Sequence, residues 1–164
     1  MAWAFFGLFG GLPLMRSQLG LGFTDAYFEA VSALTTTGST VIEGLDNLSK
    51  GVLLWRAMMQ GIGGMGIVVL AVALLPFLRV GGMQVFRAES SEKSEKPLPR
   101  AAEIATATVL AYLVLVVCML AYWALGMSFF DAVCHAMTTM STAGFANYDA
   151  SFGAFKSPAL EWAA

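Results

Sequence analysis

Charged residues are scarce in this sequence. Only 12% of its 164 residues are Asp, Glu, Lys or Arg, and 58% are hydrophobic, whereas about a quarter of a soluble domain is charged. The formal net charge of −2 and the lack of a basic soluble face exclude a nucleic-acid partner. The deficit of charge indicates a membrane protein that has lipid as its main surroundings.

Cysteine and histidine are nearly absent as well. The chain has two cysteines, Cys118 and Cys134, and a single histidine, His135. Two cysteines in apolar surroundings favour plain packing over a disulfide framework or a metal site. No Ser/His/Asp or Cys/His arrangement that would support catalysis emerges, so we expect neither an enzyme nor a covalently bound cofactor.

What the chain has instead is long apolar runs. Residues 57–78 and 104–127 contain no charged residue, and about 20 helical residues are enough to cross a membrane. Residues 1–14 are apolar but too short for a span, and they lack the basic segment of a signal peptide. We interpret them as the tail of a helix whose beginning is missing. The end of the chain, from Pro158, predicts a further helix that is truncated.

The segment between the two runs indicates the topology. Residues 79–100 hold five of the nine Lys and Arg residues, which predicts a cytoplasmic loop by the positive-inside rule. The predicted outer ends of the helices then carry aromatic residues, as expected at a membrane interface. These residues are Trp55, Tyr122, Trp123 and Trp162.

Two short segments outside the spans resemble each other. Residues 25–38, DAYFEAVSALTTTG, match residues 131–144, DAVCHAMTTMSTAG, at Asp, Ala, Ala, Thr and Gly. Each copy follows one apolar stretch and precedes another, which makes the repeat a helix, a short segment and a second helix. The sequence therefore predicts a first repeat over 1–78 and a second over 101–164. The second long helix of the first repeat is predicted at 55–78, and the first long helix of the second repeat at 101–125.

Each short segment predicts a helix of half the membrane's thickness. Asp25 and Asp131 are predicted N-caps of helices 25–36 and 131–142. At about 1.5 Å per residue such a helix enters a membrane and cannot cross it. Irregular backbone at that depth is tolerated where it lines a cavity. The loops that follow, 35–39 and 141–145, are therefore predicted to line a pore.

The chemistry of these loops suits a monovalent cation. Backbone carbonyls can replace the water shell of an ion, glycine allows the backbone angles that turn them inward, and a helix C-terminus adds partial negative charge. The alternative is a plain helix end, in which Gly38 is only a C-cap glycine. His135 aligns with Glu29, and a helix-packing or interfacial role is favoured for both.

A glycine-rich stretch, GIGGMG at residues 61–66, has the spacing of a dinucleotide-binding turn. That motif needs a preceding strand and a following acidic residue, whereas this stretch lies inside an uncharged run. Close packing of helices is the better interpretation.

These segments resemble a known family. TDAYFEAVSALTTTGST, WRAMMQGIGGMGIVVLAVALLPFL, VGGMQVFRAE and FDAVCHAMTTMSTAGFANYDASFGAF are similar to the TrkH-type membrane subunits of the Trk/Ktr/HKT superfamily of potassium transporters. The resemblance covers nearly the whole chain. It implies an all-α membrane protein of repeated helix–pore helix/loop–helix units, like a potassium channel and truncated here at both ends, with two of four repeats present.

The resemblance also implies the site residues. In that family the carbonyls of the filter loop face potassium, and Ala143 in the second loop departs from Thr37 in the first. Sodium-selective relatives can carry serine at the first filter glycine, so glycine in both copies favours potassium. The implied filter consists of Thr35, Thr36, Thr37, Gly38 and Ser39 in the first loop and Ser141, Thr142, Ala143, Gly144 and Phe145 in the second, with potassium at Thr36, Thr37, Thr142 and Ala143.

The resemblance further implies a setting for the transporter. It implies a multi-pass protein of the bacterial inner membrane, a homodimer in full-length form, and a cytosolic nucleotide-binding regulatory subunit of the TrkA type. The resemblance implies potassium as the transported ligand. The sequence leaves open coupling to protons or sodium, a sodium-permeable relative, and a non-conducting scaffold that binds a partner through 79–100.

Overall fold

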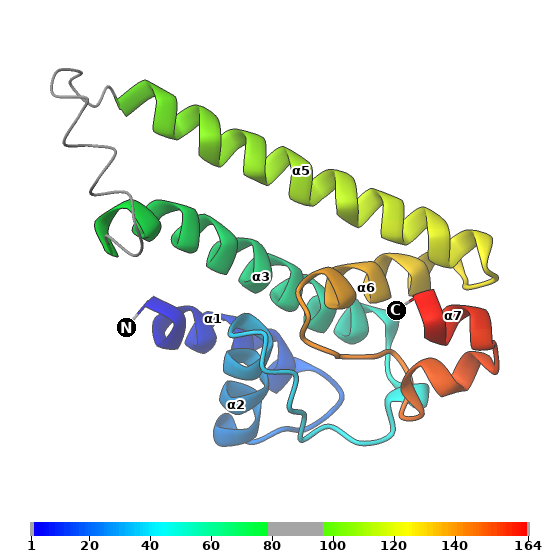
Figure 1. Ribbon diagram of the computed structural model, residues 1–164. Helices are drawn as coiled ribbons and strands as arrows, with labels where there is room; N and C mark the ends of the chain where they lie inside the picture. The colour runs from blue at the N-terminus through cyan, green and yellow to red at the C-terminus, as the bar shows by residue number, and fades with distance from the viewer. Residues whose placement is uncertain (1, 79–96, 164) are drawn as a thin grey trace, which may run out of the picture.

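The protein is a set of helices, and the part of the chain that the structure describes contains no strand (Figure 1). This computed structural model describes residues 2–78 and 97–163, with side chains for 3–67, 105–106 and 108–163. In chain order the helices are α1 (Ala2–Arg16), α2 (Phe23–Leu34), the 3-10 turn η1 (Leu45–Asn47), α3 (Lys50–Leu78), α5 (Pro97–Ala124), α6 (Phe129–Met140), η2 (Ser151–Phe155) and α7 (Pro158–Ala163).

The two short helices occur where the repeat predicts them, each with 12 residues. The predicted N-caps are wrong: α2 is capped by Gly22 and α6 by Ser128, whose hydroxyl accepts the amide of Asp131. Asp25 and Asp131 stand three residues after the cap. An acidic residue is favoured there too, because it lies beside the positive helix end. Both helices therefore begin and end about two residues earlier than predicted.

Helix α3 contains the apolar run 57–78, α5 contains the run 104–127 up to Ala124, and α7 begins at Pro158 as expected. Helices α3 and α5 begin about four or five residues earlier than predicted, and α5 ends one residue earlier. Among the residues that the structure describes, no helix is long and apolar enough to cross a membrane. The spans proposed at 57–78 and 104–127 thus remain predictions from composition. Most of the predicted cytoplasmic loop, 79–96, lies outside the described residues, and its last part forms the start of α5.

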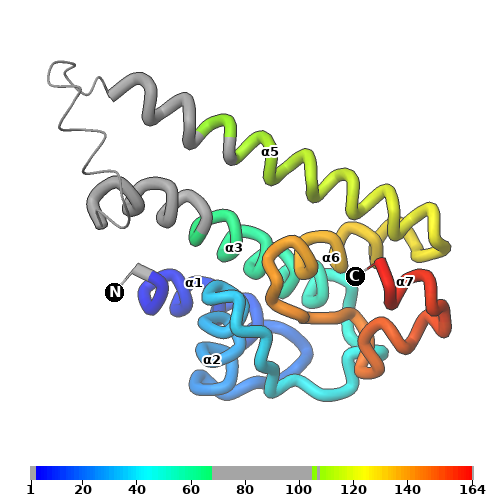
Figure 2. The backbone as a smooth tube through the Cα atoms, in the orientation of Figure 1, coloured from blue at the N-terminus to red at the C-terminus, as the bar shows by residue number. Residues whose placement is uncertain are grey.

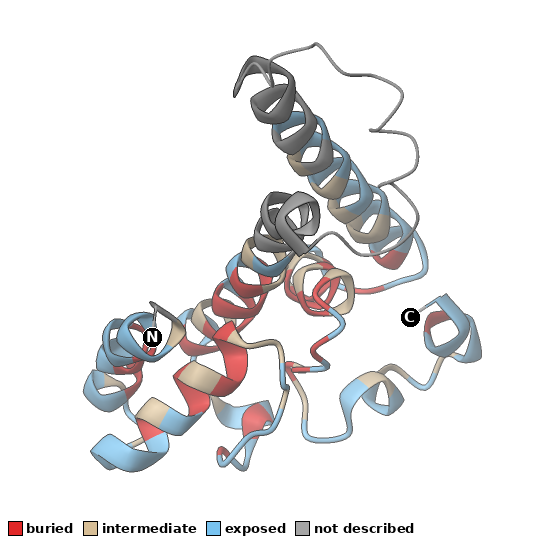
Figure 3. Cartoon of the chain, turned by 60° about the vertical axis from the view of Figure 1, so that its left-hand side comes forward, coloured by how far each residue is buried: buried red, intermediate tan, exposed pale blue. Residues whose placement is uncertain are grey.

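The short helices pack against α3 from two directions. Helix α2 contacts both α1 and α3, while α6 contacts both α3 and α5, and the chain order can be followed by colour in Figure 2. Buried residues, red in Figure 3, gather where α2, the first half of α3 and α6 meet. Helix α5 exposes many large apolar side chains, including Val109, Leu113 and Val117. The best-packed part of the fold thus surrounds the loops that follow α2 and α6.

The glycines of α3 allow this close packing. A Cβ built on Gly63 would collide with the carbonyl of Leu34 at the end of α2, and one on Gly64 would lie 2.6 Å from the Cβ of Ser141. One on Gly66 would lie 2.7 Å from the ring of Trp3. The glycine-rich stretch therefore serves helix packing, as the sequence indicates.

Replacing Gly64 by alanine is expected to destabilise the protein by about 1–3 kcal/mol, because overpacking outweighs the gain in helix propensity. Gly51 is the matched control, since a Cβ there meets no atom within 4 Å. Gly51→Ala should leave the thermal unfolding midpoint unchanged or slightly raised. Equal midpoints for the two variants would contradict the proposed packing.

Candidate functional site

The loops after α2 and α6 share one unusual backbone conformation. Thr36 and Thr142, at equivalent positions, have φ of 56° and 54°, a region that β-branched residues seldom adopt. Each loop closes its helix with the same pair of bonds, those of a Schellman motif, in which glycine normally takes this place. The bonds run from Thr36 N to Ala33 O (3.1 Å), Thr37 N to Ser32 O (2.9 Å), Thr142 N to Thr139 O (2.9 Å) and Ala143 N to Thr138 O (3.1 Å).

Gly38 and Gly144 come two residues after the strained threonines. Gly38 has φ of 78° and Gly144 has φ of 85°. The helix-end interpretation of Gly38 is therefore wrong, because Thr36 occupies the capping position. Strained backbone is a feature that functional sites often contain, and here it occurs twice in equivalent positions.

The structure brings the two loops into contact. A Cβ built on Gly38 would collide with the carbonyl oxygen of Ala143, so these loops meet where a side chain would keep them apart. Gly64 of α3 lies close to both loops, since a Cβ built there would be 2.6 Å from the Cβ of Ser141 and 3.8 Å from the Cγ2 of Thr36. Around Gly144 the space is open. Two segments about a hundred residues apart in the chain thus form one cluster.

The first loop is braced by its own hydroxyl groups. Thr35 Oγ1 donates to the carbonyl of Val31 (2.8 Å) and shares a hydrogen bond with Thr37 Oγ1 (2.8 Å). Ser32 Oγ donates to the carbonyl of Ser39 across the loop (2.6 Å). Side chains at both ends of residues 35–39 therefore hold this backbone in place.

A buried ion pair, made by residues outside the first loop, supports the segment that follows this loop. Arg56 of α3 contacts Glu29 of α2 at 2.9 Å, and the two side chains are 2% and 0% exposed. The carboxylate also accepts from Thr40 Oγ1 (2.9 Å), and Arg56 Nη2 donates to the same hydroxyl (3.1 Å). Buried charges cost much free energy unless they are paired and hydrogen-bonded. The pair therefore fixes the segment just after the first loop relative to α2 and α3.

The sequence interpretation missed Arg56. It is the last charged residue before a long uncharged run, so it resembles a boundary charge at the end of a span. The available signal was Glu29, a carboxylate in an otherwise apolar short helix that needs a cation. The local sequence does not show which basic residue pairs with Glu29, because Glu29 and Arg56 are far apart in sequence.

The second repeat anchors its loop through a different residue. The imidazole of His135, which aligns with Glu29, has no hydrogen-bond partner among the described residues and lies beside the rings of Phe152 and Phe155. This placement agrees with the packing role favoured for it. The segment after the second loop is held instead by Asp131, one turn earlier in α6.

The carboxylate of Asp131 has three side-chain hydrogen-bond donors. It accepts from Ser128 Oγ (2.7 Å), Asn147 Nδ2 (2.8 Å) and Tyr148 Oη (3.1 Å). Partial burial, followed by the charge of Asp131, raises the pKa of the Tyr148 phenol. The phenol thus stays protonated and remains a donor. Asn147 and Tyr148 come directly after the second loop, so this network ties the loop's exit to α6.

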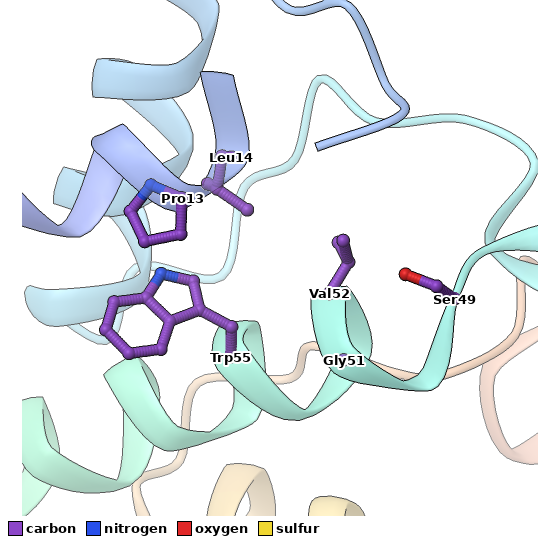
Figure 4. Close-up of a pocket in the computed structure, with 6 residues that line it drawn as sticks. All are labelled: Pro13, Leu14, Ser49, Gly51, Val52 and Trp55. Atoms are coloured by element: carbon purple, nitrogen blue, oxygen red, sulfur yellow. The ribbon is translucent and has the colours of Figure 1, made fainter. Parts of the chain in front are cut away.

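The remaining features do not form a second site. No group of three or more His, Cys, Asp or Glu side chains that could hold a metal ion occurs in the described part. A pocket of about 240 Å³ lies between the end of α1 and the start of α3 (Figure 4), lined by residues such as Pro13, Val52 and Trp55. None of its lining residues belongs to either loop. The paired loops are therefore the candidate site.

Fold and site together define an all-helical protein with two copies of one unit, a half-length helix that ends in a strained loop, packed so that the loops meet. Proteins that move cations use such loops. The chain belongs to the TrkH family of cation transport proteins, whose family model matches residues 1–164.

Individual relatives agree with this assignment. The chain is 49% identical over 164 residues to the Trk system potassium uptake protein TrkI of Halomonas elongata, covering 99% of this chain and 33% of the relative. It is 49% identical over 162 residues to TrkH of Escherichia coli strain K12, covering 96% and 34%. The crystal structure of the potassium transporter TrkH from Vibrio parahaemolyticus matches with a TM-score of 0.82 and 43% identity, covering 99% of this chain and 32% of that one. The chain thus spans about a third of its relatives' length.

Proposed function

We propose that the chain supplies two of the loops that form the selectivity filter of a potassium transporter. The observation that carries the proposal is the contact between Gly38 and Ala143, which joins two loops of the same strained conformation. Family membership and relatives named as potassium uptake proteins support potassium as the substrate.

The proposed chemistry is replacement of the ion's water shell by backbone oxygens. Positive φ at alternate residues, Thr36 with Gly38 and Thr142 with Gly144, turns the peptide planes so that successive carbonyls can face one side. Potassium would be held at Thr36, Thr37, Thr142 and Ala143, with Thr35, Ser39, Ser141 and Phe145 flanking them. The C-terminal ends of α2 and α6 would add partial negative charge toward the ion.

We propose further that these two loops are half of a ring. Four such units would surround one pore in a full-length transporter of the bacterial inner membrane, which would form a homodimer. A cytosolic nucleotide-binding regulatory subunit would contact it through the loop at 79–100. Transport by a channel-like route and transport coupled to protons or sodium are both compatible with this geometry.

The competing function is a membrane scaffold that conducts nothing. The full-length transporter is expected to restore the growth of a bacterial strain without potassium uptake systems at low external potassium, because a pore supplies the missing flux. A scaffold would not restore growth. A matched vector that carries Gly38→Ser, expressed to the same level, reports whether the rescue depends on the loops. Absence of rescue by the unchanged protein, present in the membrane in normal amount, would contradict the proposal.

A further inference from the structure

The second loop contains fewer bonds of its own than the first. Ala143 stands where Thr37 stands in the first loop, so the hydroxyl pair of Thr35 and Thr37 has no counterpart. Ser141 Oγ donates backward to carbonyls of α6, those of Met137 (2.9 Å) and Thr138 (3.0 Å). Thr138, the counterpart of Ser32, donates its hydroxyl to the carbonyl of His135 (3.1 Å) and not across the loop, as Ser32 does to Ser39. Among the described residues, the side-chain bonds within 141–145 are thus those of Ser141 at the start of the loop, and none spans the loop as in the first repeat.

Two side chains of α3, one turn apart, take over that task. Gln60, fully buried, accepts the backbone N–H of Phe145 at its Oε1 (3.3 Å). Arg56 Nη1 donates to the carbonyl of Ala146 (3.4 Å), and its guanidinium lies over the Phe145 ring, 4.2 Å from the centroid. Two residues of the first repeat therefore hold the end of the second loop at Phe145 and Ala146, whereas Asp131 of α6 holds the segment just after it.

The burial of Phe145 agrees with this cross-repeat arrangement. Its side chain is 4% exposed and belongs to the hydrophobic cluster of the first repeat, together with Ala30, Leu34 and Met59. A further hydrogen bond crosses the repeats, from the backbone N–H of Leu45 to the carboxylate Oδ1 of Asp149 (3.0 Å). The second loop is thus docked on the first repeat along most of its length, with Thr142 and Gly144 exposed.

We propose that Gln60 and Arg56 are positioning residues for the second loop, and that they determine how well its carbonyls distinguish potassium from sodium. The inference rests on the proposed function. Discrimination between potassium and sodium depends on the positions of the coordinating carbonyl oxygens. A loop with few side-chain bonds of its own takes that placement largely from the residues that support it. Gln60 acts on this loop alone, whereas Arg56 also holds the first.

The test uses Gln60→Met in the full-length transporter, since methionine has similar volume and no acceptor oxygen for Phe145. The preference for potassium over sodium is expected to fall about two- to tenfold, the effect of one hydrogen bond, with a raised KM for potassium and normal protein in the membrane. Gln18→Met is the matched control, because Gln18 is exposed and lies outside both loops. It should change neither quantity.

A second-site variant distinguishes positioning from general stability. Adding Ala143→Ser to Gln60→Met supplies a hydroxyl beside Ser141, as in the first loop, and should restore much of the preference. Gln60→Asn, which keeps the amide but has one methylene less, should lose preference as Gln60→Met does. An unchanged preference for potassium over sodium in either Gln60 variant would overturn the inference. Failure of both variants to accumulate in the membrane would also overturn it, because Gln60 would then serve folding. If Gly38→Ser changes the preference while Gln60→Met does not, only this inference fails and the proposed function stands.

Discussion

Gly38→Ser is expected to lower the preference of the full-length transporter for potassium over sodium by at least tenfold. Two costs combine at this position. A side chain at φ of 78° is strained by about 1–2 kcal/mol, and its Cβ collides with the carbonyl oxygen of Ala143. Because that oxygen is itself a proposed ligand, the loops must move apart and the proposed filter would widen. Competition of sodium with potassium in an uptake assay measures the change.

Substitutions at two other glycines separate the effect of backbone strain from the effect of the collision. Gly144→Ser carries the same strain but meets no atom within 4 Å, so its effect should be smaller than that of Gly38→Ser. Gly20 has φ of 61°, also in open space, and lies between α1 and α2 away from the loops. Gly20→Ser should keep the normal preference at slightly lower stability. Equal losses in all three variants would mean that the collision has no part in selectivity.

The second large effect is expected at Arg56. Arg56→Met leaves the Glu29 carboxylate buried without its cation, and such a break costs about 3–5 kcal/mol. It also releases Ala146 and the Phe145 ring. We therefore expect little protein in the membrane and almost no potassium uptake. The thermal unfolding midpoint of purified protein and uptake per protein molecule are the two measurements.

A double variant identifies the cause. Combining Arg56→Met with Glu29→Gln removes both charges, and it should recover a large part of the stability, since no unpaired charge remains. Uptake should recover less, because the bonds to the second loop stay broken. Glu29→Gln alone leaves the cation without a full charge partner and should also destabilise. A double variant no more stable than Arg56→Met would show that the ion pair is not the source of the loss.

The helical architecture could be predicted from the sequence because the same residue pattern occurs in two segments of the chain. The shared Asp, Thr and Gly of segments 25–38 and 131–144 located both short helices. The uncharged context of residues 61–66 identified their glycines as packing residues. Each inference needed only local sequence and a repeat.

The details of the site could not be predicted, because they depend on contacts distant in sequence. Thr36, a β-branched residue, is held in a conformation usual for glycine by the bonds at the end of α2, whereas local preference favours Gly38. Helix starts at Gly22 and Ser128 were missed because an acidic residue suits both the cap and the third position. The cross-repeat contacts of Arg56 and Gln60 involve loops more than eighty residues away, and no local pattern reports such a pairing.

The most direct test of the central claim is to locate the ion. Rubidium, a potassium substitute with anomalous scattering, can be introduced into crystals of the full-length transporter. The account predicts an anomalous peak at coordination distance from the carbonyl oxygens of Thr36 and Thr37 and of Thr142 and Ala143, weakened in Gly38→Ser. A rubidium peak elsewhere in the protein, with none between these two loops, would contradict it.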